Sequence, residues 1–279
     1  MADEFVHSKV QNGVLVLTLD DPKTRNSLGP EMNKEMTEHL NNFESDQDLR
    51  VLVITGADPA FCSGANVRGF DQGIRDREAS GPPPPPNPWE RFDPTYNAQF
   101  QLRQGQNMTQ RVYNLKKPTI AAVNGHAYGI GNGIAIGCDV RIASESARFC
   151  EVFVQRGLIS ADGSCWLLPR LVGMSNALMM QFTGEPVLGQ EAYRIGLAYK
   201  VVPHADLMDE TMELAEKLAK LPTVSQSLMK MMIHKSYTQD FHEHMNEVNL
   251  AMRIAQSTED HKEGVRAFLE KRQPLFKGR

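Results

Sequence analysis

Two glycine-containing turns carry the backbone groups of this chain that could do chemistry. The longer turn, residues 124–133, follows a β-prone run at 118–123, and the shorter one, residues 61–66, follows a similar run at 51–55. A helix that starts from a glycine-rich turn leaves its first N–H groups without partners, and its N-terminus carries partial positive charge. Two such turns can direct two N–H donors at one carbonyl oxygen. The pattern therefore predicts an oxyanion hole.

The periodicity of apolar residues indicates an α/β core followed by a helical lobe. Strands alternate with helices in the first part of the chain, which is typical of α/β layers. The predicted strands are residues 14–19, 51–55, 118–123 and 139–143. A helix is predicted after the longer turn, ending at about residue 137, and the other predicted helices are 28–43, 108–115, 164–171, 175–182, 189–195, 205–220, 224–236, 241–256 and 259–271. We expect the core to span residues 1–200 and the lobe residues 201–279. Residues 69–107 include five consecutive prolines, which indicate an inserted loop or flap.

Composition excludes several classes of function. The chain has 279 residues, a net charge of −4 and 23% charged residues, so no field for nucleic acid or anionic membranes is expected. No secretory signal or membrane-spanning run is evident, and a cytoplasmic protein is expected. The four cysteines lack metal-binding spacing, and His242 and His244 do not share a helix face. No metal site is predicted.

Five segments, in this order and spacing, resemble the crotonase superfamily, also called the enoyl-CoA hydratase/isomerase family. They are DPKTRNSL (21–28), FCSGAN (61–66), KPTIAAVNG (117–125), LPRLVG (168–173) and EGVRAFLEKR (263–272). The resemblance covers nearly the whole chain. It implies a superhelix of β-β-α turns with C-terminal trimerisation helices, and a homotrimer or a dimer of trimers. It also implies an acyl-CoA substrate and no cofactor beyond the coenzyme A of that substrate.

The resemblance assigns the two oxyanion donors to the backbone N–H groups of Ser63 and Ile130. Such donors stabilise the enolate of a thioester without selecting a reaction. The acids and bases beside the enolate select it, and here the chain departs from the family. Hydratases of the family carry glutamates at the positions of Gly133 and Phe153. Because both acids are missing, hydration by two glutamates is disfavoured.

Two carboxylates remain as candidate catalytic groups. Some relatives use an acid at the position of Ala161, and the next residue is Asp162, which could be the base or simply cap a helix. Glu151 could reach the site if residues 149–153 are extended, or it could be solvated and paired with nearby arginines. His126, within the longer turn, is a weaker candidate because the family tolerates many residue types there.

The resemblance also locates the coenzyme A and acyl sites. Arg25 matches the segment that lies along the nucleotide, and Ala65, Asn66 and Val67 match the segment that contacts adenine and pantetheine. Lys271, in the terminal tail, could reach a phosphate. Tyr128 and Trp166 are expected to line the acyl pocket, and the absence of two glutamates favours a bulky or cyclic acyl group.

The expected function is isomerisation of an acyl-CoA, or hydration through one carboxylate, with Asp162 as the leading base. Two alternatives remain open at the level of the sequence. One is hydrolysis of a C–C bond in a cyclic β-dicarbonyl substrate, and the other is a non-catalytic acyl-CoA-binding protein.

Overall fold

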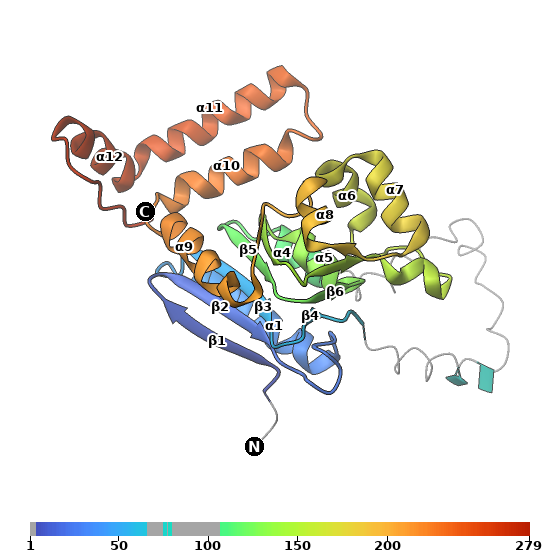
Figure 1. Ribbon diagram of the computed structural model, residues 1–279. Helices are drawn as coiled ribbons and strands as arrows, with labels where there is room; N and C mark the ends of the chain where they lie inside the picture. The colour runs from blue at the N-terminus through green and yellow to red at the C-terminus, as the bar shows by residue number, and fades with distance from the viewer. Residues whose placement is uncertain (1–3, 66–74, 77, 80–106) are drawn as a thin grey trace.

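The computed structural model describes residues 4–65, 75, 76, 78, 79 and 107–279 (Figure 1). Almost all of the predicted insertion at 69–107 lies outside the described residues, as do Asn66 and Val67. Within the described part, the chain forms two sheets, a set of helices packed around them, and a helical arm that carries the C-terminus.

The larger sheet has six strands in the order β1-β2-β3-β5-β7-β10. The strands are β1 (Val6–Gln11), β2 (Val14–Leu19), β3 (Val51–Gly56), β5 (Thr119–Val123), β7 (Val140–Ser144) and β10 (Lys200–Val202). Only the β1–β2 pair is antiparallel, and the other pairs are parallel. The buried strands β2, β3 and β5 are continuous apolar runs because helices cover both of their faces.

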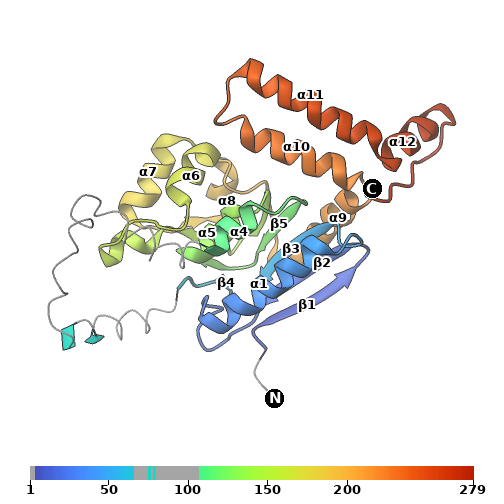
Figure 2. The same cartoon turned by 180° about the vertical axis from the view of Figure 1, so that it is seen from behind.

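The alternation of side chains along these strands builds two cores on opposite faces of the sheet. On one face, residues such as Leu17 and Ile54 pack against α1 (Pro30–Ser45). On the other face, residues such as Val16 and Val53 pack against α9 (Leu207–Ala219). Figures 1 and 2 show these two helices on opposite sides of the sheet.

A smaller four-stranded sheet, in the order β4-β6-β8-β9, was not predicted. Its strands are β4 (Ala60–Cys62), β6 (His126–Tyr128), β8 (Arg148–Cys150) and β9 (Val187–Leu188). The parallel pairs β4–β6 and β6–β8 bring the two glycine turns and residues 148–150 side by side. This small sheet therefore positions the candidate site.

Short helices follow the strands and surround this region. They are α4 (Asn107–Tyr113), α5 (Ile130–Gly137), the 3-10 helix η1 (Val152–Arg156), α6 (Ser164–Val172), α7 (Met174–Thr183), α8 (Gly189–Arg194) and the 3-10 helix η2 (His204–Asp206). Helix α5 starts directly after β6, and its N-cap Gly129 has φ of 52°, a left-handed angle that glycine adopts readily.

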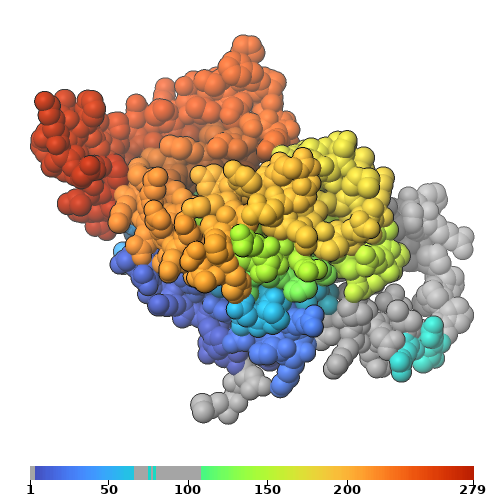
Figure 3. Space-filling model, in the orientation of Figure 1, coloured from blue at the N-terminus to red at the C-terminus, as the bar shows by residue number. Residues whose placement is uncertain are grey.

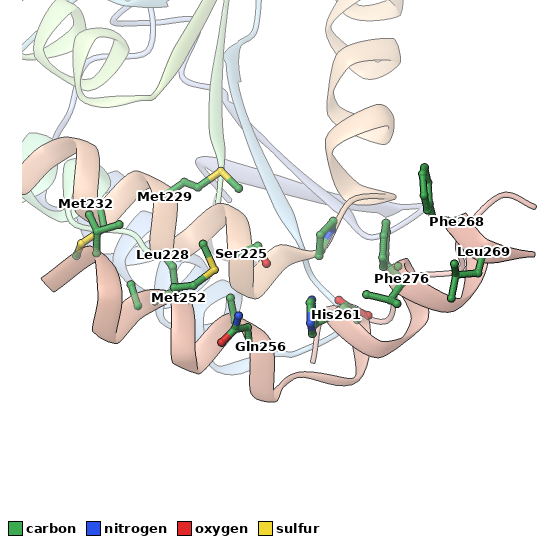
Figure 4. A pocket seen from close by; sticks show the side chains of 17 residues that line it. Ser225, Leu228, Met229, Met232, Met252, Gln256, His261, Phe268, Leu269 and Phe276 are labelled. Carbon is green, nitrogen blue, oxygen red and sulfur yellow. The ribbon is translucent and has the colours of Figure 1, made fainter. Parts of the chain in front are cut away.

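The last three helices, α10 (Thr223–Lys235), α11 (Phe241–Ser257) and α12 (Glu259–Leu269), form an arm that projects from the body (Figures 1 and 3). An apolar pocket of about 600 Å³ lies between them, lined by methionines and by Phe268 and Phe276 (Figure 4). The predicted domain boundary after residue 200 falls inside β10, which pairs with β7. None of the described helices combines the length and apolarity that crossing a membrane requires.

Candidate active site

The two glycine turns meet because their glycines allow backbone to approach backbone. A side chain on Gly131, in the first turn of α5, would begin 2.1 Å from the carbonyl oxygen of Cys62. A side chain on Gly64 would begin 2.7 Å from the carbonyl oxygen of Tyr128. Both distances are far below van der Waals contact. The turn at residues 62–65 therefore packs directly on the start of α5.

The N-terminus of α5 supplies one predicted donor, the backbone N–H of Ile130. This residue is the first of the helix, where the N–H groups lack partners within the helix. Among the described residues, the Ile130 N–H makes no backbone hydrogen bond outside the helix either. The neighbouring Gly129 N–H is engaged with the carbonyl oxygen of Cys150 at 2.9 Å.

The other predicted donor, the Ser63 N–H, is occupied. It donates to the carbonyl oxygen of Arg25 at 3.0 Å, so the prediction that this N–H is a free donor is wrong. Two residues further on, the carbonyl oxygen of Gly64 accepts from the Leu28 N–H at 2.8 Å. In a trans peptide group the C=O and N–H point in opposite directions, so the Ala65 N–H points away from Leu28. Ala65 therefore replaces Ser63 as the donor that this turn can offer.

Glu151 is completely buried and accepts hydrogen bonds from three side chains, of which the Gln181 amide is the most distant, at 3.5 Å from Oε2. The Asn132 side-chain amide donates to Oε1 at 2.6 Å, and the Ser160 hydroxyl donates to Oε2 at 2.7 Å. Burial raises the pKa of Glu151 to about 7, and the neighbouring charge of Asp162 contributes in the same direction. The alternative that Glu151 is solvated is therefore wrong. The condition that residues 149–153 are extended is not met, because β8 ends at Cys150 and η1 begins at Val152.

Asp162 is buried as well, but its two oxygens differ. Oδ1 accepts from the backbone N–H of Ser164 at 3.1 Å and from its hydroxyl at 2.7 Å. The cap-like role of Asp162 is thus present, since α6 begins at Ser164. Oδ2 has no hydrogen-bond partner in the described part of the chain. Burial raises the pKa of Asp162.

The free oxygen of Asp162 occupies the space where a side chain at residue 133 would begin. A Cβ atom on Gly133 would lie 2.6 Å from Asp162 Oδ2 and 2.6 Å from Thr109 Oγ1. A glutamate at residue 133 and an inward-facing Asp162 therefore exclude each other. This contact gives a physical reason for two departures from the family pattern that the sequence shows separately.

Asp162 lies on the wall of a cavity of about 360 Å³. Thr109, Tyr113, Ala161 and Trp166 also line it. Trp166 was expected to line an acyl pocket, whereas Tyr128 is not among the lining residues. Because Gly133 lies three residues after Ile130 in α5, the Asp162 carboxyl group is displaced from the Ile130 N–H by about 4.5 Å along the helix axis.

The residues predicted to bind coenzyme A are only partly brought together. Arg25 lies beside the shorter turn, since its carbonyl oxygen accepts from the Ser63 N–H, and Ala65 lies in that turn. Lys271 follows α12 at the end of the helical arm, well away from β4 in Figures 1 and 2. Within one subunit, Lys271 is therefore not part of this site.

Three polar residues of the site were missed from the sequence: Asn132, Ser160 and Thr109. Asn132 lies within the longer glycine turn and Ser160 lies two residues before Asp162, and a buried carboxylate requires donors of this kind. His126 is half-buried at the edge of β6, and burial, with the nearby charges of Arg148 and Arg25, lowers its pKa. Within the described ranges, no group of three or more His, Cys, Asp or Glu side chains could hold a metal ion.

The fold and the site together define an α/β protein with two buried acids beside the N-terminus of a helix. Known proteins agree with this class. The enoyl-CoA hydratase/isomerase family profile matches residues 9–279. The chain therefore belongs to the enoyl-CoA hydratase/isomerase family, the crotonase superfamily, and is an acyl-CoA enzyme of that family.

Similar proteins include enzymes with different reactions. The chain is 35% identical over 276 residues to a 1,2-epoxyphenylacetyl-CoA isomerase of Escherichia coli (strain K12), with 99% of each chain covered. It is 34% identical over 271 residues to an (E)-benzylidenesuccinyl-CoA hydratase of Thauera aromatica, with 97% of this chain and 98% of that one covered.

A solved structure confirms the predicted fold class. The enoyl-CoA hydratase from Bacillus anthracis superposes with a TM-score of 0.83 at 30% identity and covers 99% of this chain and 100% of that chain. The family and the enzyme class predicted from the sequence are confirmed as well.

Proposed function

We propose that this chain moves a proton on the acyl group of an acyl-CoA, as an isomerase, with Asp162 as the base. The observation that carries the proposal is the Oδ2 atom of Asp162. It is buried, lacks a partner among the described residues, lies beside Gly133 of α5, and belongs to a residue that lines the cavity. A buried carboxylate with a raised pKa and a free oxygen is suited to accept a proton near neutral pH.

The N–H groups of Ile130 and Ala65 are the donors for the thioester oxygen in this proposal. Two features support them: the Ile130 N–H starts a helix, and the Ala65 N–H points away from the segment that engages Ser63. The positive end of the α5 dipole adds to the stabilisation of an anion at this position. Each such donor contributes about 2.7–4 kcal/mol to transition-state stabilisation in comparable sites.

The chemical steps follow from these positions. Asp162 removes a proton from the carbon next to the thioester carbonyl, and the C–H electron pair forms the enolate while negative charge moves onto the thioester oxygen. With a double bond at the next position, the enolate extends into a dienolate. The protonated Asp162 then returns the proton to the far carbon of that dienolate. The double bond has shifted, and the base is regenerated without any other reactant.

Glu151 is the proton-bearing partner of the pair. When Glu151 is ionised, the single proton of the Ser160 hydroxyl is shared between two acceptors, Glu151 Oε2 at 2.7 Å and Gln181 Oε1 at 2.5 Å. When Glu151 is protonated, it donates to Ser160, which in turn donates to Gln181. The neutral form of Glu151 therefore satisfies the network, and its lack of charge leaves Asp162 free to ionise.

The proposed acyl group is bulky or cyclic. The ring of Phe153 packs near Gly129, 3.5 Å from where a Cβ would begin. The rings of Tyr113 and Trp166 lie edge to face at 5.7 Å on the cavity wall. One relative is named as an epoxyphenylacetyl-CoA isomerase and another as a benzylidenesuccinyl-CoA hydratase. These names favour an aryl-derived acyl group for this chain. Arg25 and Ala65 are the described residues we propose for the coenzyme A moiety, together with Asn66 and Val67.

Hydration through one carboxylate is the second candidate. Asp162 Oδ2 and Thr109 Oγ1 both lack a hydrogen-bond partner among the described residues, and both lie beside Gly133. This arrangement would let Asp162 activate water instead of accepting a carbon-bound proton.

The substitution Asp162→Asn tests the proposal because it keeps the shape of the side chain and removes the base. We expect kcat to fall by about 10²–10⁴-fold, with the dissociation constant for a saturated acyl-CoA unchanged. The substrates to compare are a 3-enoyl-CoA, crotonyl-CoA and a cyclic β-dicarbonyl acyl-CoA. Incubation in D2O, followed by NMR, would show deuterium entering the acyl chain of the wild type only.

Other results would contradict the proposal. An Asp162→Asn enzyme with normal turnover would exclude Asp162 as the base. Turnover confined to the β-dicarbonyl substrate would favour C–C hydrolysis. Tight binding of every acyl-CoA with neither turnover nor deuterium exchange would favour a non-catalytic binding protein.

A further inference from the structure

Two serines lie two residues before and two residues after Asp162, and each gives its hydroxyl to a different acid. Ser164 is completely buried, and its hydroxyl donates to Asp162 Oδ1 at 2.7 Å. Ser160 is 6% exposed, and its hydroxyl donates to Glu151 Oε2 at 2.7 Å. The backbone N–H of Ser164 also donates to Asp162 Oδ1, at 3.1 Å. No other described residue donates a hydrogen bond to the Asp162 carboxyl group.

We propose that Ser164 is a positioning residue for the base. By holding Oδ1 with two donors, Ser164 keeps the first negative charge of the acid pair on Asp162 and leaves Oδ2 as the atom that accepts the substrate proton. The inference rests on the proposed function in one respect, that Asp162 is the base. Ser164 is not among the residues that line the cavity beside Asp162, so it acts through Asp162 and not on the substrate.

The two donors of Ser164 make the two oxygens of Asp162 different. A backbone N–H can only donate, so Oδ1 remains an acceptor for as long as this hydrogen bond is kept. The N–H belongs to the first residue of α6, where N–H groups have no partner within the helix. Two donors on the same oxygen also limit rotation of the carboxyl group. Oδ1 and Oδ2 therefore do not exchange places, and Oδ2 is the oxygen that stays available.

The contacts of the two acids decide which of them carries a proton. A protonated Glu151 donates to the Ser160 hydroxyl, which in turn donates to Gln181 Oε1. A proton on Asp162 Oδ2 would find no acceptor among the described residues, and a proton on Oδ1 would displace the two donors of Ser164. A buried donor without an acceptor is unfavourable. The pair therefore ionises first at Asp162.

The other ionisable side chains close to Asp162 keep one charge state in the acidic and neutral range. Cys165 of α6 and Tyr113 of α4 line the same cavity as Asp162. Burial raises the pKa of the Cys165 thiol and of the Tyr113 hydroxyl, so both groups stay neutral there. Helix α5 has no ionisable side chain. Among the described residues, Glu151 is therefore the group whose ionisation is linked to that of Asp162.

The test compares Ser164→Ala with Ser160→Ala, because the two changes remove the same hydroxyl from different acids. The dependence of kcat on pH is measured for a 3-enoyl-CoA with the full-length chain, and its acidic limb reports the ionisation of the base. Ser164→Ala removes a donor that favours the ionised form of Asp162. We expect its acidic limb to move up by about 1 pH unit. We expect its kcat on the plateau to fall about 3- to 10-fold through the loss of orientation, with KM unchanged.

Two controls show whether the effect belongs to the Ser164 hydroxyl. Ser160→Ala leaves both donors of Asp162 in place, so its acidic limb should not move to higher pH. Ser164→Thr keeps a hydroxyl at this position and should keep the acidic limb of the wild type. The dissociation constant for butyryl-CoA, measured by isothermal titration calorimetry, should be the same in Ser164→Ala and in the wild type.

A measurement on the wild type keeps the proposal testable if Ser164→Ala fails to fold. NMR of 13C-labelled carboxyl groups follows the two ionisations in the unliganded protein, with signals assigned through Asp162→Asn and Glu151→Gln. We expect Asp162 to ionise at a lower pH than Glu151.

Three results would overturn the inference: a wild type in which Glu151 ionises first, a Ser164→Ala enzyme with the acidic limb of the wild type, or an equal shift in Ser160→Ala. The base itself is tested by the turnover of Asp162→Asn. An inactive Asp162→Asn together with an unshifted Ser164→Ala would reject the role of Ser164 alone, so the two proposals can fail separately.

Discussion

The carboxyl groups of Glu151 and Asp162 illustrate how one buried region can hold two acids with different roles. Both Glu151 oxygens are engaged, whereas Asp162 keeps one oxygen free. Burial raises the pKa of both groups, and the second ionisation places two like charges close together. Because both Glu151 oxygens are engaged and one Asp162 oxygen is free, Glu151 has the structural role and Asp162 is the candidate base.

At the residue scale, we predict that Glu151 makes the protein less stable as the pH rises. The native pKa is raised from 4.5 to about 7, so the folded state holds a proton that the unfolded state releases. The contribution of Glu151 to the free energy of unfolding is largest below pH 4.5. It falls by roughly 3 kcal/mol as the pH rises towards 7.

Urea unfolding of the wild type and Glu151→Gln at pH 5 and pH 8 measures this effect. The substitution is expected to remove most of the difference between the two pH values. The exposed Glu185→Gln is the control and should leave that difference unchanged. A wild-type difference that persists in Glu151→Gln would show that another group causes it.

At the scale of elements, the longer strands with buried apolar residues were predicted from the sequence, and the three-residue strands were not. Strands β2, β3, β5 and β7 were predicted to within two residues because each is an apolar run of five or six residues. Strand β1 was missed because only Val6 of its six residues is buried. Strands β4, β6 and β8 have three residues each, lie inside or beside turns, and carry no periodicity of their own.

In the site, too, features set by adjacent residues could be predicted, and features set by distant residues could not. The glycine turns and Asp162 could be found locally, because a turn is a property of adjacent residues. The burial of Glu151 could not, since it depends on donors from Asn132 and Ser160 that the β6–β8 pairing brings near. The engaged N–H of Ser63 likewise depends on Arg25, which is far away in the sequence.

A proline at the first residue of α5 tests the contribution of the helix N-terminus. Ile130→Pro removes one N–H, and proline is well tolerated at the first position of a helix. Gly129 precedes it with φ of 52° and ψ of −121°, an extended left-handed conformation that avoids the α-region disfavoured before proline.

We expect Ile130→Pro to fold normally and to lose about 10²–10³-fold in kcat. Circular dichroism checks the fold, and steady-state kinetics measures the loss. Ile130→Val keeps the N–H and a branched apolar side chain, so it should retain most of the activity. Equal activity in Ile130→Pro and Ile130→Val would exclude this N–H as an oxyanion donor.

At the scale of the whole molecule, the helical arm formed by α10, α11 and α12 leaves much apolar surface exposed. Figure 3 shows α10–α12 extending beyond the body, and Phe268 and Leu269 are 82% and 73% exposed. Exposed apolar patches of this kind mark surfaces that associate with other proteins. A homotrimer or a dimer of trimers, as expected from the resemblance, would cover the arm.

The substitution Phe268→Asp tests self-association through this arm. If α10–α12 form the contact, analytical ultracentrifugation should show a shift from oligomer to monomer at micromolar concentration. Lys262→Asp, also on α12 and exposed, changes charge without removing apolar surface and serves as the control. A wild type that sediments as a monomer would contradict the expectation.

The clash between a side chain at residue 133 and Asp162 also limits the order in which this site could have evolved. In a chain with a glutamate at 133, an acid at 162 cannot turn inward as Asp162 does here, because its oxygen would lie 2.6 Å from the Cβ atom at 133. Laboratory evolution towards two-glutamate chemistry faces the same constraint. Selection that starts from this chain should recover changes at Asp162 before any larger residue appears at 133.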